Sequence, residues 1–395
     1  MFIYRKLYLD KIKSLIDVDI IKVLTGMRRS GKSIILKQIM DVLKKEKNII
    51  FINFESRKYD EIRNHEDLME YIYSLVKPNE RYYLFFDEIQ NVKNWELAIR
   101  AIYTDLDCDI YLTGSNSNML SGELTTHLTG RFIEIKIYPF SFKEFLEYNN
   151  ENNIQLSEFE QFNQYLKFGG LPVLFDIPTE ELKRDYLMGL LNTIINVDIR
   201  NRYNIKNEEL FNKLSLFLIE NISRNFSGNS IKKYLKNSGV SVNVETINKY
   251  ISYYAGACFL NKVRREDFRG KKILKTNEKY FLTDHSFREI YFNNNEDVSQ
   301  VLENIVYIEM LRRGYQITIG KIKDNEVDFI CRKSGEVIYI QVAYLLADDK
   351  IIEREFGQLA KINDNFPKYV LSMDNFDFSR QGIKHLNIID FLKSD

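Results

Sequence analysis

The sequence has few of the residues that several specialised protein classes require. It contains only 5 prolines and 17 glycines among 395 residues, which excludes collagen-like and loop-dominated architectures. The three cysteines, Cys108, Cys258 and Cys331, lie too far apart to suggest a closed set of disulfides. The 4 histidines have no cysteine or histidine at ligand spacing, so we expect no structural zinc site. This cysteine usage fits a reducing compartment, and we expect a cytoplasmic protein.

Long apolar runs and a net charge are also missing. No run of 18 apolar residues occurs, so we expect no membrane-spanning segment. The first residues, MFIYRKLYLDKIKSL, do not resemble a signal peptide because no apolar core with a cleavage site follows them. The 56 basic and 56 acidic residues cancel, so a charged partner would have to meet a local patch.

What the chain does have is enough apolar surface for sizeable cores, with 45% hydrophobic residues over a length typical of about two to three domains. Between residues 20 and 140, short apolar runs alternate with amphipathic helical patterns. The runs cover residues 20–26, 49–54, 82–88, 108–114 and 132–138. This alternation predicts an α/β fold with a mostly parallel sheet covered by helices on both faces.

The remainder of the chain changes character twice. From about 141 to 220 the pattern is helical, with a break at GGLP (169–172). Residues 207–285 read as three short helices followed by a hairpin, and the segment from about 298 reads as a small α/β unit that opens with a helix.

A phosphate-binding loop follows the first apolar run. The segment GMRRSGKS fits the P-loop pattern at every fixed position, with a strand before it and a helix after it. Its members are Gly26, Met27, Arg28, Arg29, Ser30, Gly31, Lys32 and Ser33. Lys32 is predicted to reach the β- and γ-phosphates of ATP and Ser33 to bind Mg²⁺. Arg28 and Arg29 either contact phosphates or pack outward, and the alternative for the whole segment is a chance match at a strand–helix turn.

The apolar strand ending in Asp87 and Glu88 has the pattern of a Walker B motif. Asp87 is predicted to hold Mg²⁺, and Glu88 to act as a general base on the attacking water. The alternative is an acidic pair that caps the next helix. A second carboxylate beside the metal ligand favours hydrolysis of the nucleotide over mere binding.

Two further features carry weaker candidates for the same site. Ser115 and Asn116 follow the strand 108–113 and could sense the γ-phosphate, although a polar helix N-cap explains them equally well. Arg131 could stabilise transition-state charge, in its own chain or from a neighbouring subunit, or could be an ordinary solvated arginine.

Beyond these motifs, whole phrases of the sequence resemble a prokaryotic AAA-type predicted ATPase family with a conserved C-terminal domain. The phrases are the P-loop, FFDEIQNVKNWE (85–96), YLTGSNSNML (111–120), LTGRFIEIKIYPFSFKEF (128–145) and GGLP. The resemblance implies a P-loop NTPase core of the additional-strand type, a winged-helix middle and a restriction-endonuclease-like α/β domain. The expected domains are an ATPase core at 1–145, a helical lid at 146–206, a winged helix at 207–290 and the last domain at 298–395.

The expected winged helix is locally basic. Residues 222–276 contain twelve Lys or Arg and three Asp or Glu, a local excess of nine positive charges. A basic helix and hairpin can follow the phosphates of DNA or RNA with little regard to base sequence. The alternatives are a surface that docks a protein and a solvated basic face.

The tail resembles the PD-(D/E)xK nuclease fold. The resemblance implies a tentative second metal site at Glu303, Asp328 and Gln341, but Ala343 stands where active enzymes carry a lysine. Without that lysine a metal could still bind, but we do not expect efficient cleavage, and the favoured alternative is an inherited scaffold reused for binding or assembly. An active nuclease stays possible if a lysine such as Lys321 or Lys333 substitutes from a nearby strand.

Three hypotheses follow from these observations. In the first, the protein is a Mg²⁺-dependent ATPase whose nucleotide state controls a winged helix that binds nucleic acid. The second is a DNA nuclease that ATP hydrolysis licenses through the tail. In the third, the protein is a signalling or assembly switch that docks other proteins. The sequence favours the first and leaves the oligomeric state open.

Overall fold

The computed structural model describes the chain in two compact units. The described residues are 3–45, 48–116, 128, 130–205, 207–267, 272–294, 296–322 and 325–394, with side chains for all of them except 272–277. The first unit comprises residues 1–139 with 256–258, and the second comprises 140–255 with 259–395. Over these ranges no helix combines the length and apolar character needed to cross a membrane.

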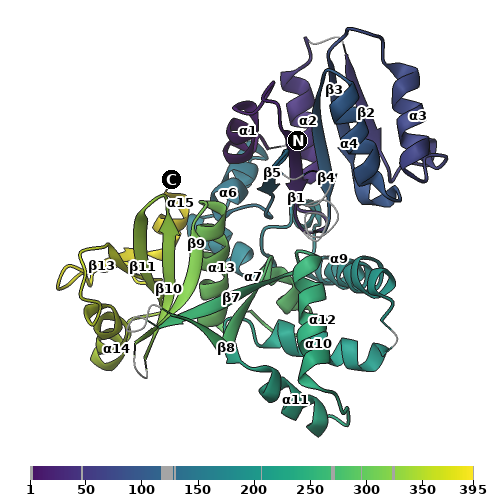
Figure 1. The fold of residues 1–395 in the computed structure, drawn as a ribbon. Coiled ribbons are helices and arrows are strands. Elements are labelled where there is room, and N and C mark those ends of the chain that lie inside the picture. Colours follow the sequence, from purple (N-terminus) through teal and green to yellow (C-terminus); the bar gives the residue numbers. More distant parts are fainter. Residues whose placement is uncertain are drawn as a thin grey trace. The chain divides into compact units, whose positions relative to one another are not determined.

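The first unit is built on a parallel five-stranded sheet, as predicted (Figure 1). Its strands are β1 (Ile21–Thr25), β2 (Ile49–Asn53), β3 (Tyr82–Asp87), β4 (Cys108–Gly114) and β5 (Phe132–Lys136). They lie in the order β2-β3-β4-β1-β5. Strand β4 thus lies between β1, which precedes the P-loop, and β3, which ends in the acidic pair.

Helices cover both faces of this sheet. They are α1 (Lys6–Lys13), α2 (Lys32–Val42), α3 (His65–Leu75) and α4 (Trp95–Asp105). In β3, Tyr83 and Phe85 pack with α1 and α2, while Leu84 and Phe86 pack with α3 and α4. Because successive side chains of a strand point to opposite faces, a strand that is apolar at every position must be covered twice.

The second unit begins with helices. They are α6 (Phe142–Glu151), α7 (Glu158–Phe168), α8 (Val173–Asp176), α9 (Glu180–Thr193) and the π-helical continuation η4 (Ile194–Asn201). Ser141 and Ser157 begin α6 and α7 with capping boxes, in which Glu144 and Glu160 bond back to the capping residue.

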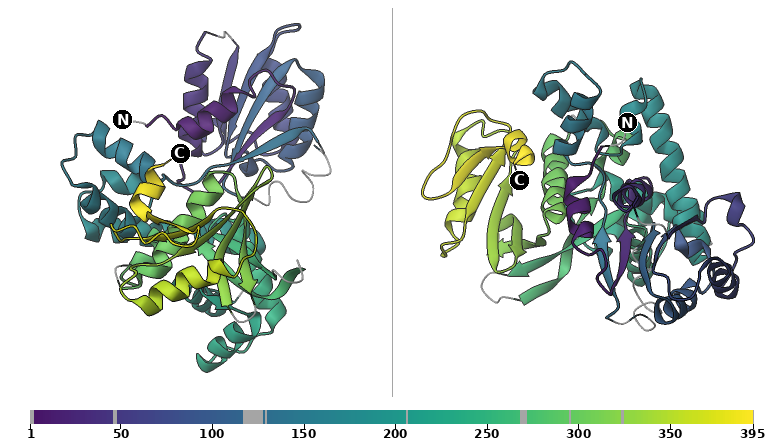
Figure 2. Two further views of the ribbon diagram at one scale, coloured as in Figure 1. Left: turned by 90° about the vertical axis from the view of Figure 1, so that its left-hand side faces the viewer. Right: turned by 90° about the horizontal axis from the view of Figure 1, so that it is seen from above.

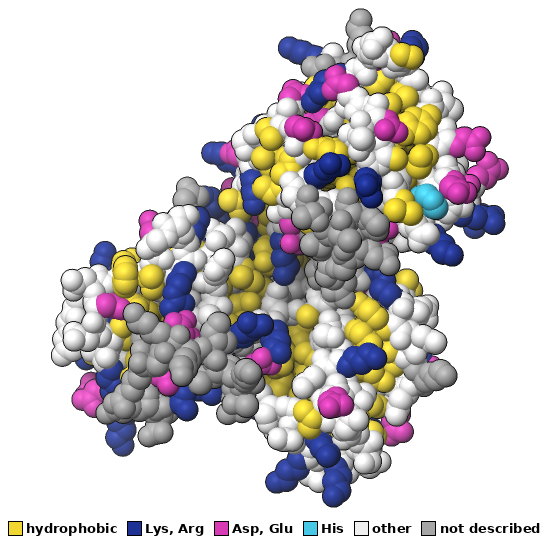
Figure 3. Space-filling view, viewed as in Figure 1, with side chains coloured by type: hydrophobic (Ala, Val, Ile, Leu, Met, Phe, Trp, Pro, Cys, Tyr) yellow, Lys and Arg dark blue, Asp and Glu magenta, His cyan; other side chains and the backbone are white. Residues whose placement is uncertain are grey.

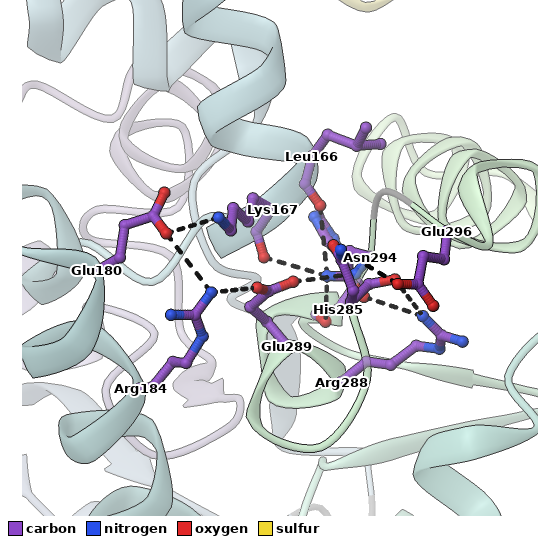
Figure 4. A network of polar contacts seen from close by, with 10 residues as sticks. Leu166, Lys167, Glu180, Arg184, His285, Arg288, Glu289, Asn294 and Glu296 are labelled. Carbon is purple, nitrogen blue, oxygen red and sulfur yellow. Dashed lines mark hydrogen bonds and ion pairs between the residues drawn. The ribbon is translucent and has the colours of Figure 1, made fainter.

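A polar network ties these helices to η5 (His285–Ile290), which follows the hairpin in sequence (Figure 4). Arg184 of α9 pairs with the buried Glu289 at 2.7 Å. The other oxygen of Glu289 accepts from the Asn294 backbone N–H, and the Asn294 amide donates to carbonyls of Leu166 and Lys167. Glu289 and Asn294 are buried, while Arg184 is partly exposed, so the network supports the unit from its interior to its surface.

The GGLP segment lies where α7 packs against the residues that follow the hairpin. A Cβ on Gly169 would lie 2.1 Å from the Asp284 carboxylate, and one on Gly170 would lie 2.1 Å from the Phe140 carbonyl oxygen. The Gly170 N–H instead donates to Asp284 at 2.8 Å. The two glycines therefore let α7 approach the segment after the hairpin closely.

The middle of the unit contains the three expected helices and the hairpin. These elements are α10 (Glu208–Glu220), β6 (Asn225–Phe226), α11 (Gly228–Asn237), α12 (Val244–Gly256), β7 (Leu260–Asp267) and β8 (Lys272–Leu282). Strand β8 pairs antiparallel with both β7 and the short β6.

The tail is an α/β unit, but its sheet does not stand alone. Its elements are α13 (Val298–Arg312), β9 (Gln316–Ile322), β10 (Asn325–Lys333), β11 (Glu336–Val342), α14 (Asp349–Ala360), β12 (Lys368–Ser372), β13 (Lys384–Asn387) and α15 (Ile388–Lys393). Strand β9 pairs in parallel with β7 of the hairpin. One eight-stranded sheet, β13-β12-β11-β10-β9-β7-β8-β6, therefore runs through the middle and the tail (Figure 2).

Candidate nucleotide-binding site

The P-loop turns tightly between β1 and α2. A Cβ on Gly26 would lie 2.2 Å from the carbonyl oxygen of Ile137, so only glycine fits there. Gly31 (φ 97°) and Arg29 (φ 68°) are both left-handed, and α2 begins at Lys32. Such a loop presents backbone N–H groups and the positive end of a helix to one point, which suits a phosphate.

Lys32 is buried at the mouth of this loop with its ammonium among oxygens. Its Nζ donates to the carbonyls of Gly26 at 3.1 Å and Met27 at 3.3 Å, and lies 3.5 Å from Glu88 Oε1. The side chain is only 3% exposed. A buried ammonium surrounded by acceptors is placed to exchange them for phosphate oxygens.

Asp87 and Ser33 meet as the sequence predicted. The Ser33 hydroxyl donates to Asp87 Oδ1 at 3.0 Å, and the Thr113 hydroxyl donates to the same oxygen at 2.6 Å. Burial raises the pKa of Asp87, and the two hydroxyl bonds partly offset that rise. A nearby cation would favour the ionised form.

The residues present fit ATP and Mg²⁺. A hydroxyl from α2 and a carboxylate from β3 are the oxygen ligands that Mg²⁺ takes from proteins, alongside phosphates and water. The buried Ser30 hydroxyl has no hydrogen-bond partner within the described ranges. An unsatisfied buried hydroxyl inside a phosphate loop is consistent with a ligand that supplies the missing partner.

Glu88 lies beside Asp87 in a strained backbone conformation. Its φ of 54° is left-handed, which is uncommon for a non-glycine residue and frequent at functional sites. The side chain is buried, with Lys32 near Oε1 and the Gln90 amide donating to Oε2 at 2.5 Å. Burial opposes ionisation of Glu88, but Lys32 and Gln90 outweigh it and hold its pKa below the usual range.

Strand β4 supplies the polar residues next to this pair. Ser115 and Asn116 are buried after its end, and the Gln90 amide also lies 3.4 Å from Ser115 Oγ. The sequence reading missed Thr113, whose hydroxyl also accepts from the Glu88 N–H at 2.9 Å. Its position, level with Asp87 on the neighbouring strand, becomes evident only once the strand order is known.

The arginines around the loop differ in role. Arg28 pairs with Glu55 at 3.1 Å, and Arg29 is exposed. Arg5, which the sequence reading did not select, is buried and donates to the carbonyls of Ser30 at 3.0 Å and Pro139 at 3.3 Å. Arg5 thus supports the P-loop from behind.

Arg131 is not brought to this site. It precedes β5, whose first residue Phe132 is paired with Ile21 at the start of β1. The P-loop follows the other end of β1, about 13 Å away at 3.3 Å per residue. Its guanidinium lies instead over the ring of Tyr103, 5.8 Å from the centroid. This position does not support a catalytic role for Arg131 within its own chain. A role in a neighbouring subunit stays a prediction, and an ordinary surface arginine stays the alternative.

In the tail, Glu303 and Asp328 do converge, but around a lysine. Lys279 of β8 lies 2.7 Å from Glu303, 2.7 Å from Glu326 and 3.7 Å from Asp328. Its side chain is 5% exposed. We call Lys279, Glu303, Glu326 and Asp328 the lysine–carboxylate cluster.

Gln341 and Lys333 do not join this cluster as ligands. The Gln341 side-chain oxygen accepts from the Asp328 N–H at 3.2 Å, and Lys333 donates to the carbonyl of Arg313. Across the described ranges, no three His, Cys, Asp or Glu side chains are arranged to hold a metal ion. The cation found among these acids is Lys279, which the sequence reading did not anticipate.

Comparison with known proteins places this geometry in a family. Residues 19–146 match the model of an AAA domain, and residues 159–297 match that of a domain of unknown function. The Walker-type ATPase PABY2304 of Pyrococcus abyssi is similar in fold, with a TM-score of 0.53 at 15% identity over 73% of this chain and 95% of that one. The parallel P-loop sheet is thus confirmed.

Two relatives extend the likeness along nearly the whole chain. An uncharacterized protein of Haemophilus influenzae is 36% identical over 99% of this chain and 98% of its own length. The uncharacterized protein MJ1544 of Methanocaldococcus jannaschii is 30% identical over 94% and 85%. The chain belongs to the family of AAA-domain P-loop proteins that these two relatives represent.

Proposed function

We propose that this protein is a Mg²⁺-dependent ATPase whose nucleotide state controls a nucleic-acid-binding winged helix. The observation that carries the proposal is the meeting of Lys32, Ser33, Asp87 and Glu88 at the end of the parallel sheet. Nucleotide binding alone would need no second buried carboxylate beside Asp87, whereas hydrolysis needs a base.

The chain's own residues divide the work. The loop amides and Lys32 bind and orient the phosphates, and Ser33 and Asp87 would hold Mg²⁺. The metal, when bound, neutralises charge that develops on the phosphate oxygens. Glu88 takes a proton from the attacking water, and Thr113 keeps both acids in place through its two hydrogen bonds.

Replacing Lys32 by Ala should weaken ATP binding by about 10- to 100-fold, because a charge-assisted hydrogen bond to phosphate is lost. Glu88→Gln should retain binding and lower turnover by about 10²-fold or more. Lys37→Ala, on the exposed side of the same helix, is the matched control. Calorimetric titration and phosphate release measure both effects. Wild-type turnover in Glu88→Gln would refute the assignment of the base.

The order of elements in the middle supports the winged-helix part of the proposal. Three helices, α10, α11 and α12, precede the hairpin β7–β8, and the short β6 between the first two helices pairs with β8. That is the arrangement expected of a winged helix.

The positions of the basic side chains indicate which surface of the proposed winged helix would bind nucleic acid. Lys232, Lys233 and Lys236 are exposed on α11, and dark blue side chains gather at the lower tip of Figure 3 over that helix. Among the basic residues of the hairpin, Arg265 pairs with Glu326 at 3.0 Å and is mostly buried. Arg269 and Lys271 lie outside the described residues. The surface that the proposal uses is therefore α11, not the base of the hairpin.

Substituting Lys232, Lys233 and Lys236 together by Ala should weaken binding to unrelated DNA sequences alike, since phosphate contacts carry no base information. The log–log salt dependence should flatten by up to about 0.9 per lost duplex contact. Lys350, Lys361 and Lys384 are exposed in the tail, and their triple alanine variant removes the same charge as a control. Fluorescence anisotropy at several salt concentrations gives the answer. Absence of salt-sensitive binding in the wild type would favour a protein-docking switch.

For the tail we propose a supporting scaffold and not a nuclease. Lys279 supplies the positive charge that a metal would bring, and Ala343 leaves no lysine at the usual place. Because Lys279 belongs to the hairpin and the acids to α13 and β10, the cluster fastens the two parts of the shared sheet together.

Lys279→Met should lower the free energy of unfolding of the second unit by about 3 kcal/mol, because it leaves buried carboxylates without their cation. Lys262→Met is the matched control on the same hairpin. Lys262 pairs with Glu278 at 2.7 Å but is 45% exposed, so its loss should cost less than about 1 kcal/mol. Urea unfolding followed by circular dichroism measures both, and equal costs would contradict a special role for Lys279.

The cost of Lys279→Met should also depend on pH. Burial raises the pKa of Glu303 to about 8 and that of Asp328 to about 6, although Lys279 acts in the opposite direction. Acids with raised folded-state pKa values stabilise the fold at low pH and lose that contribution as pH rises through those values. Because Lys279 lowers both pKa values, its removal raises them further, and the folded variant must hold more protons than the wild type. The substitution should therefore cost more at pH 8, where Asp328 of the wild type is ionised, than at pH 5, where both acids are mostly protonated.

Supercoiled plasmid incubated with the protein, ATP and Mg²⁺ or Mn²⁺ should remain uncut. The expectation follows from the lysine that occupies the cluster and from the absence of a metal arrangement among the described residues. Agarose electrophoresis detects nicking directly. Nicking that disappears in Asp328→Ala would establish the nuclease hypothesis in place of the scaffold.

A further inference from the structure

Gln90 connects the acidic pair to strand β4. It lies in the short turn η2 (Ile89–Asn91), which begins directly after Glu88. Its side-chain nitrogen donates to Glu88 Oε2 at 2.5 Å and lies 3.4 Å from Ser115 Oγ. One amide thus contacts candidate residues that directly follow two neighbouring strands, β3 and β4.

The other end of the same amide is unsatisfied. Gln90 Oε1 is buried and has no hydrogen-bond partner within the described part of the chain. A buried acceptor without a donor costs about 1–3 kcal/mol, so such atoms usually have a partner in the working state. Since two contacts on the nitrogen fix the amide plane, the oxygen is fixed too, and it requires a donor next to Glu88.

Lys32 limits what Glu88 can do in the absence of nucleotide. The ammonium lies 3.5 Å from Glu88 Oε1, while Gln90 occupies Oε2. Phosphate oxygens compete for Lys32, and its movement toward them would free Oε1 while Gln90 still holds Oε2. A water donating to Oε1 of Glu88 and to Oε1 of Gln90 would then satisfy both.

We propose that Gln90 is a catalytic residue that holds the attacking water together with Glu88, a role that rests on the proposed ATPase function. The water oxygen bonds to the γ-phosphorus as the bond from that phosphorus to the β–γ bridging oxygen breaks. ADP retains the electron pair, Glu88 takes the proton, and Gln90 is unchanged. Orientation of this kind raises the rate without strengthening the binding of the nucleotide.

The opposite role is also testable with the same residue. If the bond from Gln90 only held Glu88 away from the water, its removal would accelerate hydrolysis. The unsatisfied oxygen distinguishes the two roles in advance, because a pure restraint on Glu88 would need the nitrogen alone.

The test compares Gln90→Leu, which keeps the bulk and removes both polar ends, with Asn91→Leu in the same turn, whose exposed amide contacts the Phe54 carbonyl. Gln90→Leu should lower kcat by about 10- to 100-fold and leave KM and the ADP affinity within about twofold. Its affinity for Mg²⁺–ADP–aluminium fluoride, which mimics the transferring phosphoryl group, should fall by a similar factor. Asn91→Leu should change none of these.

Unchanged or faster turnover in Gln90→Leu would overturn the role of Gln90, as would an equal loss of affinity for ADP and its aluminium fluoride complex. The shorter amide of Gln90→Asn provides a second variant if the leucine variant does not fold, and the same split between kcat and ADP affinity is expected. Absence of turnover in the wild type would refute the ATPase proposal and this inference with it. Normal wild-type turnover that Gln90→Leu leaves unaffected would refute only the inference.

Discussion

The buried charge of Asp87 is the constraint on which the nucleotide site depends. A carboxylate almost out of contact with water needs partners, and the chain provides hydroxyls from α2 and β4. Those partners require the P-loop helix to begin at one side of Asp87 and Thr113 to stand level with it on the other. The order β3-β4-β1 meets this requirement, so the sheet topology and the site explain each other.

The second unit also contains buried carboxylates, but their negative charge is balanced in a different way. Its three clustered acids also need positive charge, but here the chain supplies it permanently through Lys279. The first unit instead places Lys32 between two P-loop carbonyls and Glu88, contacts that phosphate oxygens would replace in the proposed function. An exchangeable cation suits a site that turns over, and a resident one suits a joint between strands.

Local patterns were enough to predict the strands of the first unit and the P-loop, because alternation, glycine spacing and strand-end acids are all encoded within a few residues. The roles of Thr113, Gln90 and Lys279 were not predictable in this way, since each depends on which strand lies beside which. The run at 132–138 did predict that Arg131 precedes a strand, but only the pairing of β5 with β1 shows that it lies at the opposite end of β1 from the P-loop. Contacts between strands distant in sequence carry the information that was missing.

The parallel pairing of β7 with β9 bears on how this chain can be divided. The second family match ends at residue 297, before α13. One of the two strands that pair with β7 is β9, which lies after that residue. A fragment that ends at residue 297 would leave the backbone N–H and C=O groups along one edge of β7 unpaired. Such an edge can pair with strands of other chains and promote aggregation. The fragment would also lack Glu303, Glu326 and Asp328, the three acidic residues that surround Lys279. The end of the second family match thus falls within a single sheet, and a fragment that keeps this sheet whole has to include the strands of the tail.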